Sequence, residues 1–241
     1  MTTFVLVHGS WHDGTSWDAV ISRLEELGHT AYGPTVAGHG QGVNKAVSHN
    51  DCVQSVVRFI EEKDLRDVVL LGHSFGGTII ARVAEEIPDR LRRLIFWNAF
   101  VPQPGNRLLD EVPPHYKDMF SSLAAASEDN TVSLPFEIWR EAFIQDGDLD
   151  LARDTYKQLS AEPFQPFTEP LPLTAFYQTT LPKSYLNGTE DTALPPGEWG
   201  WHPRMSSRLG LHRLVQMPGS HEVVFSNPTL LAEKIVEAGR D

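Results

Sequence analysis

Short apolar runs alternate with longer amphipathic stretches through the first half of this chain. The apolar runs that predict strands are residues 3–7, 29–32, 67–71 and 91–97. The longer stretches predict helices because their apolar side chains recur every three or four residues. These stretches are residues 14–27, residues 49–63 and a segment that ends near Ile87. Strands that alternate with helices pair in parallel through right-handed crossovers, so the pattern predicts an α/β fold with a mostly parallel central sheet flanked by helices.

The alternation breaks at about Asn98 and returns near Lys183. Between these points the chain carries many prolines, scattered aromatic residues and short helical patterns. The clearest of these helical patterns are residues 136–144 and 148–160. The elements predicted after the break are strands at 183–187 and 211–216 and a helix at 228–237. We therefore expect one domain over residues 1–241, in which residues ~100–180 form an inserted, mainly helical cap over the carboxyl ends of the strands.

The composition narrows the class of protein. With 241 residues, of which 41% are hydrophobic and 22% charged, the chain is long enough for one sizeable core. Its formal net charge is −12, and its Lys and Arg residues are scattered. A duplex-binding surface needs clustered positive charge, so nucleic acid is not the expected partner. We expect a small-molecule substrate, and a homodimer stays open.

No segment of the sequence predicts a membrane span or a secretory signal. No window approaches the ~18 consecutive apolar residues of a membrane span, and the first residues lack the basic and apolar pattern of a signal peptide. The single cysteine, Cys52, cannot form an internal disulfide, and its place in a predicted helix indicates a small core residue. We therefore expect a cytoplasmic protein that does not bind membranes.

The most informative motif follows the strand at 67–71, where Gly-x-Ser-x-Gly places Ser74 between Gly72 and Gly76. A good helix-forming segment comes next. Strand, sharp turn and helix in that order are the context in which this motif forms a nucleophile elbow. Glycines are needed because the turn brings the backbone close to its neighbours. The same turn strains the Ser74 backbone and lifts the hydroxyl above the sheet.

A serine nucleophile needs a base, and the base needs an orienting carboxylate. The loop after the strand at 183–187 contains Asp191, and the loop after the strand at 211–216 contains His221. Loops at the carboxyl ends of parallel strands lie on one edge of a sheet. The sequence therefore predicts that Ser74, Asp191 and His221 meet on the same rim.

Other residues compete for these two roles. Glu190 competes with Asp191, which we favour because it comes later in the turn, in a Gly-x-x-Asp-x-x-x-Pro spacing. His202 follows a loop with two tryptophans and His212 lies inside a predicted strand, so both are inferior candidates for the base. Asp129 and Asp146 fall in the expected cap and are poor alternatives for the acid.

Acyl transfer also needs N–H donors for the developing oxyanion. The N–H of Phe75 follows the nucleophile at the start of a helix, an end that favours negative charge. The second donor should come from the loop after the first strand, and the Ser10 N–H is our candidate. His8 and His12 lie in the same loop and are expected to shape it, with His12 also a candidate for touching substrate.

Aromatic side chains are frequent in the expected cap. These residues are Phe136, Trp139, Phe143, Phe164, Phe167, Phe176 and Tyr177. As a set they suit a hydrophobic core better than a pocket, although some should line an apolar pocket. The candidates for substrate binding are His12, Trp139, Phe143, Phe164 and Tyr177.

Together these residues resemble the α/β-hydrolase superfamily, and most closely its small-cap branch of plant methylesterases, hydroxynitrile lyases and related bacterial esterases. The resemblance is carried by Phe4–Gly9 with Trp11 and Trp17, by Gly72–Gly77, by Gly188–Pro195 and by Gly219–His221. It implies a triad of Ser74, Asp191 and His221 and an oxyanion hole made by the amides of Ser10 and Phe75. It implies no cofactor and no metal.

The chain departs from the hydroxynitrile lyases of that branch at two positions. These lyases carry a Lys directly after the catalytic His, and here that residue is Glu222; their Thr in the loop after the first strand is replaced by Gly9. A carboxylate beside the base would repel a cyanide leaving group, so both changes argue against cyanide chemistry.

The sequence thus favours a serine hydrolase that cleaves a carboxylic ester of a small to medium apolar or aromatic substrate through an acyl-enzyme. A lactonase, a C–C bond hydrolase or lyase, and a cofactor-free oxygenase stay open on the same fold, because fold and triad do not choose among them. A non-catalytic ligand receptor is the alternative from another class. A strained serine argues against a receptor, which has no need of one.

Overall fold

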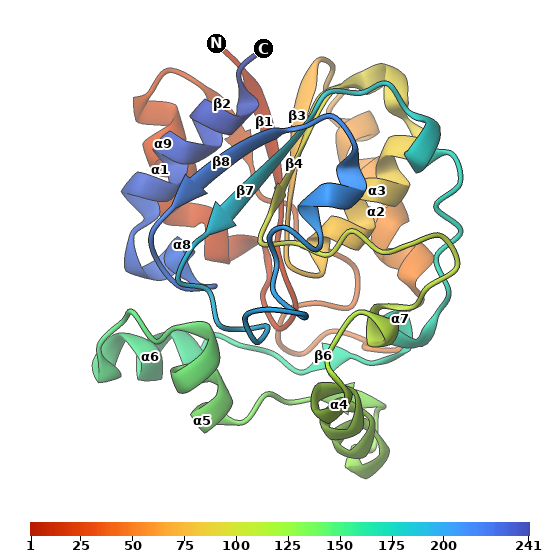
Figure 1. The fold of residues 1–241 in the computed structure, drawn as a ribbon, viewed down its shortest axis with the longest axis vertical. Coiled ribbons are helices and arrows are strands. Elements are labelled where there is room, and N and C mark those ends of the chain that lie inside the picture. Colours follow the sequence, from red (N-terminus) through yellow and green to blue (C-terminus); the bar gives the residue numbers. More distant parts are fainter.

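A computed structural model, which describes all 241 residues, contains a central sheet of six strands in the order β2-β1-β3-β4-β7-β8, with every neighbouring pair parallel (Figure 1). The strands are β1 (Thr3–Val7), β2 (Thr30–Tyr32), β3 (Val68–His73), β4 (Leu91–Trp97), β7 (Lys183–Gly188) and β8 (Arg213–Met217). The predicted α/β fold with a mostly parallel sheet is confirmed.

Helices cover both faces of the sheet. On one face lie α1 (Asp18–Glu26), the short α8 (Val223–Ser226) and α9 (Pro228–Gly239); on the other lie α2 (His49–Glu62) and α3 (Gly76–Glu86). The predicted helix at 14–27 is divided, since Gly14–Trp17 form a 3-10 turn before α1. Leu27 follows the last turn of α1 and is exposed. It therefore does not belong to the buried apolar face of the helix, although the sequence pattern predicted that it would.

The strands divide their side chains between two hydrophobic cores because successive residues of a strand point to opposite faces. In β3, for example, Val68 and Leu70 join the core under α2 and α3, while Val69 and Leu71 join the core under α1 and α9. All six residues of β3 are buried. The continuous apolar run in the sequence therefore marks a central strand that is covered on both faces.

Residues 98–182, between β4 and β7, form the inserted segment, and its helices lie beyond the carboxyl ends of the strands (Figure 1). Its helices are α4 (Pro114–Ala126), α5 (Phe136–Ile138), α6 (Leu149–Tyr156) and α7 (Gln165–Thr168). Two short antiparallel strands, β5 (Thr131–Val132) and β6 (Glu162–Pro163), connect distant parts of the segment. Its buried hydrophobic side chains belong to the core that also contains Val5, Leu70 and Leu94, on the α2 and α3 side of the sheet.

Three features of the inserted segment differ from the sequence prediction. The longest helix, α4, was not predicted. The predicted helix at 136–144 is one turn of α5 followed by a π-helical turn at Trp139–Phe143, and α6 ends at Tyr156, before the predicted end at residue 160.

No helix in the structure combines the length and the apolar character that crossing a membrane requires.

The order of the strands fixes where a site can form. The chain leaves β1 for β2 at the edge of the sheet and then returns to place β3 on the other side of β1. The segments after β1 and β3 therefore diverge and leave a crevice at the carboxyl ends of these strands, where α/β proteins bind ligands. Ser10 follows β1 and Ser74 follows β3, so both lie at this crevice.

Candidate active site

The turn between β3 and α3 holds Ser74 in a conformation that few non-glycine residues adopt. Its φ angle is 51°, in the left-handed region. A Cβ atom on Gly72 would lie 2.5 Å from the Gly76 carbonyl oxygen, and one on Gly76 would lie 2.8 Å from the carbonyl oxygens of Val7 and His8. The two glycines therefore permit a turn so tight that no side chain fits beside it.

The His221 and Asp191 side chains form a short hydrogen bond. His221 Nδ1 lies 2.6 Å from Asp191 Oδ2, and the two side chains are 1% and 0% exposed. A carboxylate only accepts, so His221 Nδ1 carries the proton and Nε2 keeps a free lone pair. Glu190, the competing acid, is exposed, and its backbone carbonyl rather than its carboxylate accepts a bond from Gln145.

Asn98 positions this carboxylate, and the sequence prediction missed it. Asn98 lies directly after β4, is fully buried and has a φ of 36°. Its Nδ2 donates to Asp191 Oδ2 at 2.5 Å, and its Oδ1 accepts from the Gly188 N–H at 2.8 Å. The Ala193 N–H donates to the other oxygen of Asp191 at 2.8 Å. A polar residue directly after a buried central strand is the signal that could have identified Asn98.

The His221 ring is enclosed by aromatic side chains. Its ring centroid lies 5.2 Å from that of Trp201, in a stacked arrangement, and 5.3 Å from that of Phe143, which meets it edge-on. His73 lies 4.4 Å away, and burial and the nearby His221 hold the pKa of His73 well below its usual value. Burial favours a neutral His221 as well, but Asp191 and Glu222 outweigh burial and raise the His221 pKa above its ordinary value.

Glu222 faces the site and not the solvent. It is 2% exposed, and it lines a narrow crevice together with Ser74 and His221. His12 Nε2 lies 3.1–3.2 Å from the two carboxylate oxygens of Glu222 and donates to this carboxylate. A second buried acid–histidine pair therefore lies beside the pair of Asp191 and His221.

The loop after β1 presents an N–H group that has no acceptor in the protein. Neither the Ser10 N–H nor the Phe75 N–H makes a hydrogen bond within the chain. Both residues adjoin Ser74, Ser10 as a neighbour in the same cavity and Phe75 as the next residue in the chain. His8 shapes this loop: its Nε2 accepts from the Val36 N–H at 3.0 Å, and its Nδ1 lies 2.8 Å from the Gly9 carbonyl.

The residue after Ser10 is held by the inserted segment. Trp11 has a φ of 65°, and its N–H donates to Glu162 Oε2 at 2.7 Å. Its indole N–H donates to the Val132 carbonyl at 2.9 Å. Glu162 is completely buried and also contacts His39 Nε2 at 3.0 Å. The β5–β6 strand pair thus fixes the loop that carries the Ser10 N–H.

Ser74 and His221 open onto the same apolar cavity. Eleven of its fourteen lining residues are hydrophobic. They are Trp11, Phe100, Leu108, Val112, Tyr116, Phe120, Phe143, Phe167, Ala193, Leu194 and Trp201. The volume open to the centre of a water molecule is only about 30 Å³, enough for a few water molecules. No hydrogen bond joins the Ser74 hydroxyl to His221, a bond that in enzymes often tightens only when substrate is bound.

Of the five residues expected to contact substrate, only Phe143 lines this cavity. Trp139 is fully buried and donates its indole N–H to the Ala152 carbonyl, and His12 is bonded to Glu222. Phe164 packs on Phe167, and it is Phe167 rather than Phe164 that lines the cavity. Tyr177 borders a different cavity, and its hydroxyl donates to the Pro102 carbonyl. The sequence pattern alone did not show which aromatic residues line the cavity and which are buried in the core.

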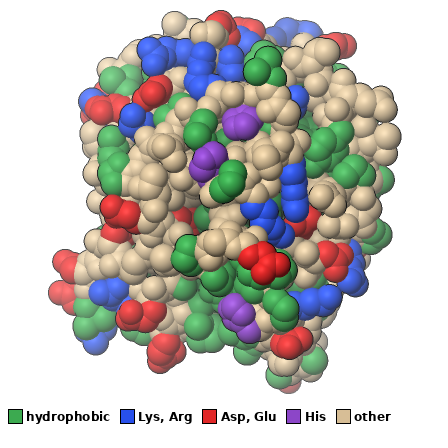
Figure 2. All heavy atoms as spheres, in the orientation of Figure 1, with side chains coloured by type: hydrophobic (Ala, Val, Ile, Leu, Met, Phe, Trp, Pro, Cys, Tyr) green, Lys and Arg blue, Asp and Glu red, His purple; other side chains and the backbone are tan.

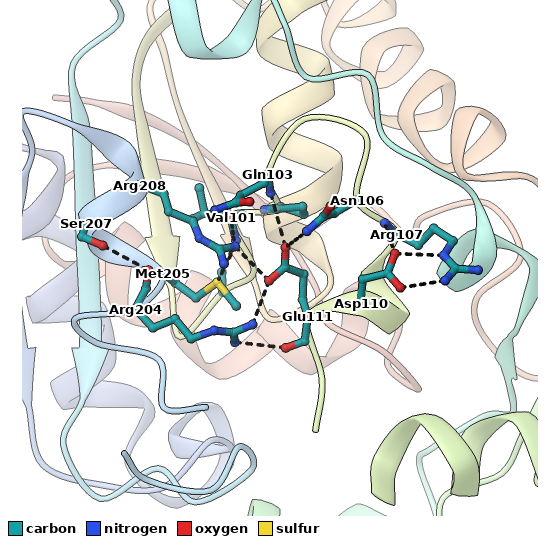
Figure 3. Close-up of polar contacts among 12 residues, drawn as sticks. Val101, Gln103, Asn106, Arg107, Asp110, Glu111, Arg204, Met205, Ser207 and Arg208 are labelled. Atoms are coloured by element: carbon teal, nitrogen blue, oxygen red, sulfur yellow. Dashed lines mark hydrogen bonds and ion pairs between the residues drawn. The ribbon is translucent and has the colours of Figure 1, made fainter. Parts of the chain in front are cut away.

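A buried ionic network supports one wall of the cavity (Figure 3). Glu111 is 1% exposed and accepts from Arg204 at 2.8 Å and from Arg208 at 2.9 Å. Asn106 and the Gln103 N–H donate to its other oxygen. The cavity residues Leu108, Val112 and Trp201 lie within three positions of Glu111 or Arg204 in the chain. The network therefore fastens the start of the inserted segment to the loop that brings Trp201 onto His221.

One group of side chains has the composition of a metal site. His73, His221 and Glu222 offer ligand atoms that all lie within 4.8 Å of one another. A metal bound there would use the same His221 ring that is hydrogen-bonded to Asp191. The arrangement therefore suits a base in a charge-stabilising environment better than a resident ion.

Comparison with known proteins agrees with this fold. The sequence model of the alpha/beta hydrolase family matches residues 4–234. A solved structure described as an extracellular alpha/beta-hydrolase from a Paenibacillus species, with structural and functional homology to tobacco salicylic acid binding protein 2, is 45% identical over the whole of both chains, with a TM-score of 0.98.

Curated relatives also match nearly the whole chain, among them an esterase and a hydroxynitrile lyase. The carbendazim hydrolyzing esterase of Nocardioides sp. (strain SG-4G) is 29% identical over 99% of this chain and 100% of its own length. The alpha-hydroxynitrile lyase of Arabidopsis thaliana is 24% identical over 99% of this chain and 97% of its own length. The resemblance inferred from the motifs is confirmed.

Proposed function

This chain belongs to the alpha/beta hydrolase family, and we propose that it is a serine esterase that cleaves a carboxylic ester of a small to medium apolar or aromatic substrate through an acyl-enzyme. The observation that carries the proposal is the short Asp191–His221 hydrogen bond, made at the cavity that Ser74 lines. It fixes the imidazole in the tautomer that can accept the Ser74 proton.

The reaction begins with substrate in the apolar cavity. His221 Nε2 removes the proton of Ser74 as the hydroxyl oxygen attacks the ester carbonyl. Asp191 stabilises the imidazolium that forms, and Asn98 and the Ala193 N–H hold the carboxylate in place. The free N–H groups of Ser10 and Phe75 are the proposed donors to the oxyanion. The imidazolium then protonates the departing alcohol.

Deacylation repeats these steps with water as the nucleophile. His221 removes a proton from water, water attacks the acyl carbonyl, and Ser74 leaves with the proton that His221 returns. The chain of proton transfers closes without a cofactor. The raised pKa of His221 favours the protonated form that the leaving group needs.

The lining of the cavity supports an uncharged substrate. Apart from Ser10, Ser74 and His221, every lining side chain is hydrophobic. The Glu222 carboxylate lies beside the base and would repel an anionic substrate or leaving group. The small free volume favours short acyl groups unless side chains of the inserted segment move.

Ester hydrolysis is favoured over lyase chemistry even though a hydroxynitrile lyase is among the relatives. The hydroxynitrile lyases carry a Lys directly after the catalytic His, whose positive charge suits cyanide, and in this chain that position is the buried Glu222. By contrast, the Nocardioides relative is named an esterase. A cytoplasmic location stays a prediction, since the Paenibacillus relative is described as extracellular; fractionation of the source cells decides it.

Labelling with a fluorophosphonate tests the proposal. The reagent should modify one serine per chain, and peptide mass spectrometry should place the adduct on Ser74. Phenyl acetate should protect against labelling. Modification elsewhere, or no modification of a folded protein, would favour a receptor or a reaction that does not use Ser74.

A further inference from the structure

A second cavity lies at the amino-terminal ends of the strands, and the Ser74 site lies at their carboxyl ends. About 660 Å³ of it is open to the centre of a water molecule, far more than in the cavity at Ser74. Arg93, Lys183 and Arg213, which lie at the beginnings of β4, β7 and β8, line it. The other lining residues are Tyr177, Thr179, Thr180, Leu181, Pro182, Leu209, Leu211 and His212. No acidic residue lines it. The two cavities are therefore separate sites at opposite ends of the same strands.

Arg93 is buried without an acidic partner. It is 7% exposed, no carboxylate oxygen lies within 4.0 Å of its guanidinium, and its buried Nε has no hydrogen-bond partner. Its Nη1 contacts the Ser184 hydroxyl at 3.2 Å, a neutral group. Asp241 attracts the Arg93 charge only from a longer distance. Arginine is rarely buried unless it is paired, so this guanidinium needs an explanation.

Lys183 has no acidic partner either. Its Nζ donates to the Thr179 carbonyl at 3.3 Å and forms no ion pair. Burial lowers the pKa of Lys183, and burial and the neighbouring Arg213 lower the pKa of Arg93. A nearby negative charge would relieve both effects.

Structural roles account for only part of this positive charge. Arg213 donates to backbone carbonyls at the end of α9, including those of Glu237 at 3.3 Å and Asp241 at 3.1 Å, which is an ordinary way to cap a helix. Lys183 and Arg93 each donate to a single backbone carbonyl, that of Thr179 at 3.3 Å and that of Lys183 at 3.5 Å, and neither side chain contacts a carboxylate. The chain has 32 acidic residues against 20 Lys and Arg, so cations without partners are not explained by a shortage of carboxylates.

We propose that this cavity binds a small phosphoryl dianion, either free phosphate or a phosphate monoester. Two unpaired cations supply charge-assisted hydrogen bonds, and the guanidinium of Arg93 suits two oxygens at once. The hydroxyls of Thr179 and Thr180, which also line the cavity, add neutral donors. Lys and Arg side chains gather near this end of the molecule (Figure 2), which would attract an anion to a protein whose net charge is negative.

Isothermal titration with sodium phosphate at constant ionic strength tests this proposal on the intact protein. We expect one site per chain for the wild type. Lys183→Gln should weaken binding at least ten-fold, and Arg93→Met should do the same. The control is Lys157→Gln, which removes an exposed lysine of the inserted segment and should bind phosphate as the wild type does. Phenyl phosphate and inorganic phosphate, titrated side by side, show whether the monoester or the free ion binds more tightly.

Circular dichroism shows whether each variant is folded, and Lys183→Gln provides the test if Arg93→Met does not fold. The proposal is independent of ester hydrolysis, because the Ser74 site lies at the other edge of the sheet. Equal affinity of the wild type and Lys183→Gln would overturn it, as would a wild type that gives no heat beyond that of a matched chloride titration.

Discussion

Glu162, in the inserted segment, accepts a 2.7 Å hydrogen bond from the backbone N–H of Trp11, the residue that follows Ser10. Its carboxylate also contacts His39, and both side chains are fully buried. Burial favours a neutral His39, but the Glu162 charge outweighs burial and raises the His39 pKa. A buried, charge-assisted bond of this kind fixes the orientation of the peptide group between Ser10 and Trp11. This restrains the adjoining peptide group between Gly9 and Ser10, which carries the Ser10 N–H.

Glu162→Ala should therefore lower kcat with little change in KM, because the Ser10 N–H acts on the oxyanion of the transition state. We expect a loss of roughly ten- to a hundred-fold, less than the ~10²–10³ that follows complete removal of an oxyanion donor. Glu162→Gln keeps an acceptor for the Trp11 N–H and should recover most of the activity. Steady-state kinetics, with active sites counted by fluorophosphonate labelling, measure the effect.

The control is Glu169→Ala, which removes a carboxylate of the inserted segment that accepts from the backbone N–H of His49 and does not contact the loop after β1. It should leave kcat unchanged. Equal losses for Glu162→Ala and Glu162→Gln would assign Glu162 a purely structural role.

The acid of the site can be identified by comparing two neighbouring carboxylates. Asp191→Asn should lower kcat by about 10⁴, because the amide favours the wrong imidazole tautomer. Glu190→Gln should cost no more than a few-fold, since Glu190 is exposed. Turnover of p-nitrophenyl acetate by the two variants provides the comparison. The opposite ranking would show that Asp191 is not the acid.

Glu222 should influence the pH at which the enzyme becomes active. His221 must be neutral to accept a proton, so kcat/KM rises as pH passes upward through the His221 pKa. Glu222 contributes to raising this pKa. Glu222→Gln should therefore move the acid limb of the pH profile to lower pH, and Glu222→Lys should move it further.

Glu222→Lys should also improve the hydrolysis of esters that carry a carboxylate, because a repulsive charge becomes attractive. Glu190→Gln, an exposed neighbour of Asp191, is the matched control and should keep the wild-type profile. An acid limb that stays in place in both Glu222 variants would mean that the Glu222 charge does not reach His221.

The size of the cavity should limit the acyl chain. Tyr116 is 8% exposed and lines the cavity beside Phe120. Tyr116→Ala should raise kcat/KM for p-nitrophenyl octanoate relative to the acetate by at least about ten-fold, the lower end of what one methylene in a hydrophobic pocket is worth. Tyr32→Ala, which alters a tyrosine of β2 outside the cavity, should leave the ratio unchanged. No change in the Tyr116 variant would place the acyl chain elsewhere.

Much of the fold could be predicted from the sequence because local pattern and tertiary role agree there. The buried central strands are short apolar runs, and α2 has an apolar face at helical spacing. The pattern failed in the inserted segment. Helix α4 buries Tyr116, Phe120 and Ala124, whose helical spacing the sequence prediction missed. What they pack against lies in distant parts of the chain, which local periodicity does not reveal. The β5–β6 pair joins residues thirty positions apart and leaves no local signal.

The sequence predicted those parts of the site that follow from where parallel strands place the loops after them. Ser74, Asp191 and His221 follow three strands of one sheet, and topology alone brings these loops to one edge. The residues that position them were missed. Asn98 and Glu162 act through hydrogen bonds that depend on the exact path of the backbone. The place of Asn98 directly after a buried strand was the one signal available for it, and nothing in the local sequence distinguishes Glu162 from an ordinary acidic residue.

The central claim is that Ser74 forms a covalent acyl-enzyme, and the turnover of Ser74→Ala tests it most directly. The measurement is kcat for p-nitrophenyl acetate, with circular dichroism to show that the variant is folded. The account predicts a loss of about 10⁴ to 10⁶, the range seen when a triad member is removed. A folded variant that keeps more than a tenth of wild-type turnover would contradict it and point to a reaction led by His221.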